Sequence, residues 1–166
     1  MSESLRERIH AFLDDSGLEY EVLDCDPELA DTAVFCEHYG VPLDCSVNCI
    51  LVKAKTGGER FAACVLLATT RLDVNKVVRK RLEARRVSFA SADETRELTG
   101  MEIGGVTPLC LPESLPLWVD ARVMDAPYVI LGGGDRSSKI RIAPRIFDQV
   151  PACTVIDGLA KPPQEA

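Results

Sequence analysis

The sequence lacks the long apolar runs and the export signals that would place it in or across a membrane. None of its apolar stretches approaches the roughly 20 residues that a membrane-spanning helix needs. Its first four residues include an acid and no apolar core, unlike a signal peptide. We therefore expect a cytoplasmic protein with no membrane partner.

The usual patterns of metal sites, disulfides and nucleophiles are also missing. The seven cysteines form no C-x-x-C pair, and the only histidines are His10 and His38. A zinc site needs about four clustered Cys or His ligands, so we expect no metal and no cofactor. No Ser-His-Asp signature, P-loop or dinucleotide fingerprint occurs. Cys110 is disfavoured as a nucleophile, because both histidines lie far from it in the sequence.

The chain has no excess of positive charge: 26 acidic and 19 basic residues give a net charge of −7. This balance argues against broad nucleic-acid binding, which depends on neutralising many phosphates with Lys and Arg. One basic run has two interpretations, a solvated helix face or a small patch that touches the end of an RNA. It consists of Lys76, Arg79, Lys80, Arg81, Arg85 and Arg86.

Local patterns predict alternating helices and strands. Ser4 with Glu7, and Ser91 with Glu94, form capping boxes at two predicted helix starts. The turn at residues 56–58, Thr-Gly-Gly, predicts a hairpin. Helices are predicted over residues 5–16, 32–39, 74–82, 91–100 and 144–150, and strands over 20–23, 47–54, 61–68, 87–89, 117–119, 128–131 and 140–142.

This interleaving predicts one mixed α/β (α+β) domain over residues 1–158. Residues 159–166 are rich in Pro and polar side chains and are predicted to form a disordered tail.

The segment over residues 98–109 contains three glycines and a proline between a predicted helix and a predicted strand. Glycine permits positive φ and close approach of a ligand to bare backbone, and proline fixes φ. Such a loop can aim backbone N–H groups at a ligand, although a purely structural turn would have the same composition.

Short motifs occur in a specific order along nearly the whole chain. They are Leu72-Asp73, Lys76, Thr99-Gly100, Gly104-Gly105-x-x-Pro108-Leu109, Leu115-Pro116, Val119-Asp120-Ala121 and Gly132-Gly133. Together they resemble the YbaK/EbsC family, which is related to the editing domain of prolyl-tRNA synthetases. The resemblance implies a curved, barrel-like mixed sheet with flanking helices. It also implies trans-editing, the hydrolysis of the ester that joins a wrong amino acid to tRNA. The implied partners are a tRNA acceptor end carrying an amino acid and, as a second candidate, an aminoacyl-tRNA synthetase.

The resemblance also implies a site. Its catalytic residues would be Gly104, Gly105, Thr107 and Asn48, and its substrate-binding residues Val106, Pro108, Ile50, Tyr20, Gly132, Gly133 and Asp120. Three of these assignments have structural alternatives. Tyr20 could be a core residue, Asp120 could cap a turn, and Gly132 with Gly133 could form a hairpin turn.

One position departs from the family pattern. Relatives carry a lysine where this chain has Asn48, and asparagine brings a hydrogen-bond donor but no charge. Lys53 lies on the opposite face of the predicted strand, which leaves Lys76 and Lys139 as possible replacements. The same departure supports an alternative function, a catalytically weakened module that binds an acylated RNA end or a small ligand.

Overall fold

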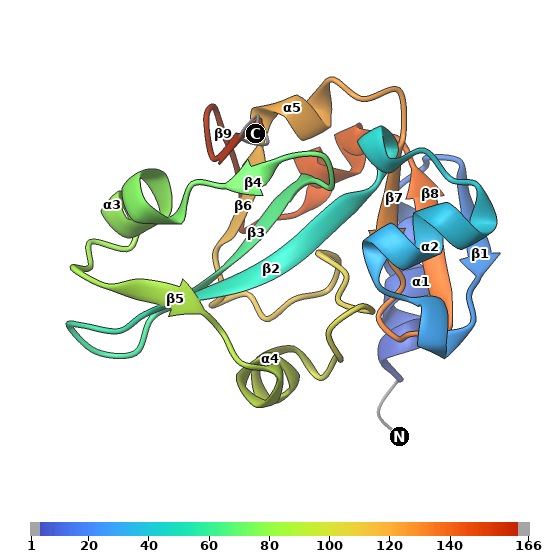
Figure 1. Ribbon diagram of the computed structural model, residues 1–166. Coiled ribbons are helices and arrows are strands. Elements are labelled where there is room, and N and C mark those ends of the chain that lie inside the picture. Colours follow the sequence, from blue (N-terminus) through green and yellow to red (C-terminus); the bar gives the residue numbers. More distant parts are fainter. Residues whose placement is uncertain (1–3, 163–166) are drawn as a thin grey trace.

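The computed structural model describes residues 4–162, in which strands gather into two larger sheets and one small ladder (Figure 1). The five-stranded sheet has the order β5-β2-β3-β6-β9. Its strands are β2 (Val47–Ala54), β3 (Phe61–Leu67), β5 (Val87–Phe89), β6 (Leu117–Asp120) and β9 (Cys153–Ile156). β2 and β3 form the predicted antiparallel hairpin, whereas β6 runs parallel to both β3 and β9.

A three-stranded antiparallel sheet, of order β1-β8-β7, lies beside the larger one. It consists of β1 (Tyr20–Asp24), β7 (Val129–Gly132) and β8 (Ser138–Ile142). A parallel bridge between Ser46 and Ile130 joins the two sheets. The mixed α/β class is therefore confirmed. The sheets stay open, however, so the expected barrel-like sheet is in fact two sheets that meet at a seam.

Two helices cover opposite faces of the three-stranded sheet. α1 (Leu5–Asp15) begins with the predicted Ser4–Glu7 capping box and packs Ile9 and Leu13 with Leu131. α2 (Thr32–Tyr39) packs Phe35 against Ile130, the neighbouring residue of β7. Because successive strand residues point to opposite faces, the two helices enclose the sheet.

The remaining helical segments are short. α4 (Ala92–Thr99) begins with the predicted Ser91–Glu94 capping box and ends at Gly100. The predicted helix after Asp73 is a π turn, η3 (Val74–Val78), followed by α3 (Arg79–Arg81). The others are η1 (Pro27–Leu29), η2 (Leu43–Cys45), α5 (Ala121–Met124) and the 3₁₀ helix η4 (Pro144–Gln149).

The predicted tail begins too early. β10 (Ala160–Lys161) pairs with β4 (Arg71–Leu72), and Leu159 and Ala160 are buried. Residues 159–161 therefore belong to the packed structure, whereas residues 163–166 of the predicted tail lie outside the described part of the chain. Among residues 4–162, no helix is both long and apolar enough to span a bilayer.

Candidate functional site

A pocket of about 260 Å³ lies at the seam between the two sheets. Beyond the Ser46–Ile130 bridge, β2 and β7 separate, and β5 covers the free edge of β2 only at residues 52–54. The edge of β2 over residues 47–50 is therefore open to the pocket. The other walls come from the start of α2, the glycine loop, β7 and β8.

Five of the eleven predicted site residues line this pocket: Asn48, Ile50, Gly104, Val106 and Gly132. They come from β2, the glycine loop and β7, segments that are far apart in the sequence. Of the four residues predicted to be catalytic, Asn48 and Gly104 line the pocket, and Gly105 and Thr107 do not. Their action on a substrate remains a prediction.

Asn48 is oriented by the first residue of α2. The Thr32 hydroxyl donates a hydrogen bond to Asn48 Oδ1 over 2.6 Å. With its oxygen held in this way, the Asn48 side chain has its amide N–H groups left to donate. Thr32 also lines the pocket, so this pair fixes one polar wall.

Lys139 supplies a positive charge to the same pocket. Its Nζ donates to the carbonyl oxygens of Ala30 (2.6 Å) and Gly104 (2.8 Å) and lies 5.4 Å from the centre of the Phe35 ring. Removal from water lowers the pKa of this ammonium. An ammonium has three N–H donors, so two bonds to carbonyls leave one for a ligand.

Of the two lysines that the sequence analysis kept as replacements for the family lysine, one lines the pocket and the other does not. Lys139 lines the pocket, whereas Lys76 lies in a separate hollow on the basic helix. Lys53 donates to Glu94 over 2.5 Å on the far side of β2, as its strand position indicated. A charge is present in the pocket although Asn48 brings none.

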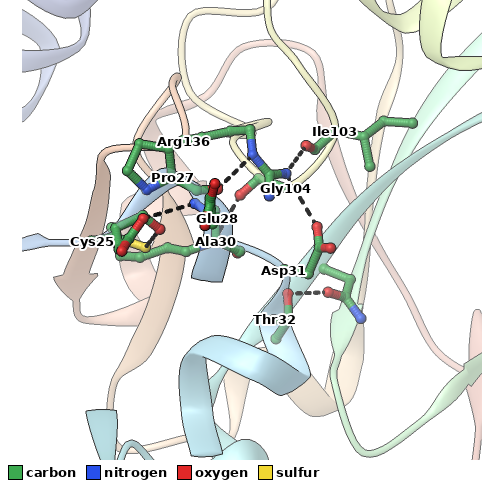
Figure 2. A network of polar contacts seen from close by, with 12 residues as sticks. Cys25, Pro27, Glu28, Ala30, Asp31, Thr32, Ile103, Gly104 and Arg136 are labelled. Atoms are coloured by element: carbon green, nitrogen blue, oxygen red, sulfur yellow. Dashed lines mark hydrogen bonds and ion pairs between the residues drawn. The ribbon is translucent and has the colours of Figure 1, made fainter. Parts of the chain in front are cut away.

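Arg136 ties the glycine loop to the start of α2 (Figure 2). Its Nε donates to Pro27 O over 2.9 Å, and its Nη1 donates to Ile103 O over 2.6 Å and to Asp31 Oδ1 over 3.2 Å. The guanidinium thus links η1, the glycine loop and the start of α2, and the last two of these segments line the pocket. Arg136 and Asp31 were not among the predicted site residues.

The glycines allow two loops to touch through their backbones. A Cβ at Gly105 would overlap the carbonyl of Asp135, and one at Gly132 would overlap the carbonyl of Val106. Gly134 N–H also donates to Gly105 O over 2.8 Å. This contact between the loops explains why Gly105 and Gly132 are glycines, and their roles toward a substrate stay predictions.

The backbone N–H groups of the glycine loop differ in whether they are hydrogen-bonded within residues 4–162. Gly105 N–H donates to Glu102 O over 2.9 Å, and Thr107 N–H donates to Met101 Sδ over 3.3 Å. Thr107 is fully buried, so neither of these predicted catalytic residues offers its N–H to a ligand. Within the described chain, no hydrogen bond uses the N–H groups of Gly104 and Val106, which both line the pocket.

The other predicted residues lie elsewhere. The Tyr20 hydroxyl donates to Asp14 over 2.5 Å, and the side chain packs against the core. Asp120 is buried and accepts from Ala160 N–H over 3.2 Å, so it anchors β10 and does not cap α5. Pro108 lines a separate apolar hollow together with Cys110. Gly133 N–H donates to Ser138 O over 3.1 Å.

The cysteines near these hollows are poor nucleophiles. Burial raises the pKa of Cys49, which lines the candidate pocket, to about 12. Burial also raises the pKa of Cys110, whose Sγ donates to Arg8 O over 3.6 Å. A neutral thiol attacks an ester poorly. Residues 4–162 contain no cluster of three or more His, Cys, Asp or Glu side chains arranged to hold a metal.

Replacing Cys110 or Cys49 by alanine is therefore expected to change the rate of any ester hydrolysis at this pocket less than threefold. The reason is that neither thiol is ionised near neutral pH, so neither can attack a carbonyl. Initial rates of the two single variants and the wild type would check this. A loss above 100-fold for either variant, with an unchanged melting temperature, would restore thiol catalysis.

The geometry agrees with comparisons to known proteins. The aminoacyl-tRNA editing domain family matches residues 26–148 of the chain. The crystal structure of the hypothetical protein APE2540 superposes with a TM-score of 0.79 at 25% identity, over 93% of this chain and 99% of that one. A proposed trans-editing enzyme for prolyl-tRNA synthetase superposes with a TM-score of 0.74 at 24% identity, over 94% and 98%.

Proposed function

The chain belongs to the aminoacyl-tRNA editing domain family, and from this premise we propose that it hydrolyses the ester of a mischarged aminoacyl-tRNA in trans. The observation that carries the proposal is the pocket at the seam. It combines a buried ammonium, two unused backbone N–H groups and an oriented amide around a space of about 260 Å³.

The chemistry needed is modest because the ester is already activated. As water attacks the carbonyl carbon, negative charge develops on the carbonyl oxygen. The bond between that carbon and the ribose oxygen then breaks, and the proton lost by the water passes to the departing ribose oxygen, which leaves a free amino acid and a tRNA hydroxyl. The N–H groups of Gly104 and Val106 and the remaining N–H of Lys139 are the donors available for that oxygen. In other enzymes, removing one such donor costs about 10²- to 10³-fold in rate.

Each wall of the pocket has a distinct task in this proposal. Ile50 and Val106 form its apolar sides, which limit the size of the amino-acid side chain. The Asn48 amide, held by Thr32, donates to the substrate near the ester. Gly132 lets the β7 wall approach the glycine loop, so its task is to keep the pocket narrow.

A panel of mischarged tRNAs tests this function. We expect the protein to release the labelled amino acid from at least one of them, faster than the spontaneous reaction. Substitution of Ile50 by alanine should enlarge the space inside the pocket. The protein should then release a larger amino acid in preference to the one that the wild type releases. Absence of release from every member of the panel would reject the hydrolase.

The alternative, a weakened binding module, gains some support from Asn48 and from the two carbonyls that already occupy Lys139. The variant Asn48→Lys separates the two functions. If Lys139 supplies the required charge, a second lysine should change the rate less than threefold. A rise above tenfold would mean that the wild-type pocket lacks the charge it needs, and Asn48→Gln serves as the uncharged control.

A further inference from the structure

A second hollow, of about 430 Å³, adjoins the acyl pocket across β2. Asn48 and Ile50 line both, so the two spaces share a wall. The second hollow continues toward β4, β10, β5 and the start of η3, where its distinctive side chains are Arg71, Lys161 and Phe89. A ligand that extends past the open edge of β2 would enter it.

Two cations face each other on its floor. In the β4–β10 ladder, Arg71 is paired directly with Lys161, and both are exposed. Like charges directly opposite each other on neighbouring strands are destabilising. Within residues 4–162, no carboxylate lies within 4.0 Å of either side chain. A bound anion such as a phosphate would relieve this repulsion.

An exposed aromatic ring lies on another side of the same hollow. Phe89, at the end of β5, is 57% exposed, more than any other large apolar side chain of the described residues. Exposed aromatic rings beside cations are the common means by which proteins hold single-stranded nucleic acid, with bases stacked on the rings and phosphates on the cations.

The positive charge continues onto the neighbouring helix. Asn75 lines the second hollow, and the next residue, Lys76, lines a third one with Arg79, Lys80 and Arg85. Residues 74–86 contain six basic side chains and one acidic one, in a chain of net charge −7. Figure 1 shows α3 next to β4 and β5, so this local basic surface extends outward from the second hollow.

We propose that this surface holds the single-stranded 3′ end of an RNA. The terminal base stacks on Phe89, its phosphate lies between Arg71 and Lys161, and the preceding phosphates follow the basic helix. The inference rests on the proposed function, because an acyl group in the first pocket is bonded to the ribose of the terminal nucleotide. The base and the phosphate of that nucleotide must therefore lie directly outside the first pocket. Asn48 and Ile50 line both spaces, so the second hollow is the adjacent space that can hold them.

Binding of an uncharged RNA tests the surface without any ester chemistry. The probe is a fluorescent RNA hairpin with a single-stranded 3′ end of four nucleotides. Its affinity for the wild type is compared with that of Arg71→Gln/Lys161→Gln and of Phe89→Ala. The matched control is Lys55→Gln/Arg145→Gln, which removes the same charge from two exposed residues outside the three hollows described above.

We expect each test variant to weaken binding about tenfold and the control less than threefold. The slope of log affinity against log salt should fall by about 0.7 in the Arg71/Lys161 variant, as for the loss of one phosphate contact of a single strand. Equal losses in test and control variants, unchanged binding in the test variants, or no binding by the wild type would overturn the inference. Melting curves confirm that the variants are folded.

The RNA-binding surface and the proposed hydrolytic function can be rejected independently of each other. If the RNA binds as expected but no mischarged tRNA is hydrolysed, the surface stands and the hydrolase falls. If hydrolysis occurs but the test variants bind and react like the control, the hydrolase stands and the surface falls.

Discussion

Replacing Lys139 by methionine is expected to lower kcat for deacylation about 100-fold, the scale of one lost donor to a developing oxyanion. The unfolding free energy should fall by only about 1 kcal/mol, so the variant stays folded. The two carbonyls lose their donor, but the variant no longer buries an ammonium. The lowered pKa of Lys139 indicates that this burial outweighs the favourable contacts of the charge.

Steady-state kinetics and urea unfolding of the same preparation would measure both effects. Lys53→Met is the matched control, because it removes a lysine from β2 that is paired with Glu94 outside the pocket. It should leave kcat within threefold of the wild type. Equal losses of activity in the two variants would show that the charge of Lys139 has no special place in the reaction.

The lowered pKa of Lys139 also determines in which direction folding stability changes with pH. The unfolded chain binds more protons at residue 139 than the folded chain between the lowered pKa and the usual 10.5. The stability of the wild type relative to Lys139→Met should therefore rise with pH through that window and be constant below it. A fall in this difference over the same range would contradict the assigned burial of the ammonium.

Gly132→Ala is expected to destabilise the protein by about 3 kcal/mol and to abolish hydrolysis. The added Cβ would overlap the backbone carbonyl of Val106, which cannot rotate away as a side chain could, and would come into tight contact with the backbone of Gly105. Since φ of Gly132 lies outside the left-handed region, the overlap alone causes the loss.

Gly58→Ala provides the comparison for this prediction. Gly58 has φ of 98° in open space, so alanine there suffers backbone strain of about 1–2 kcal/mol but no overlap. Thermal or urea unfolding ranks the two variants. If Gly132→Ala were as stable as Gly58→Ala, the two loops would not be in the close contact described here.

Local signals predicted most of the helices and strands. The capping boxes placed the starts of α1 and α4, and α2, β2 and β5 have the predicted bounds. β9 was missed although Thr154, Val155 and Ile156 are β-branched residues typical of a strand. β4 and β10 carry no such signal, because two-residue strands form only through their pairing with each other.

The site was predictable only where local sequence features determine the backbone. Glycine and proline revealed the loop that lines the pocket, because their backbone properties are visible in the sequence. The choice of Lys139 depends on β8 lying beside β7 with α2 covering that face, which is tertiary information. Tyr20 and Asp120 were assigned by motif position alone, and the contacts that hold them involve Asp14 and Ala160.

The seam between the two sheets also determines when a binding site can exist. Its walls come from positions as distant as Asp31 and Lys139, and neither sheet alone supplies more than one side. Either sheet without the other would therefore offer no recess, so a substitution that loosens the contact between the sheets should weaken recognition even where it touches no ligand.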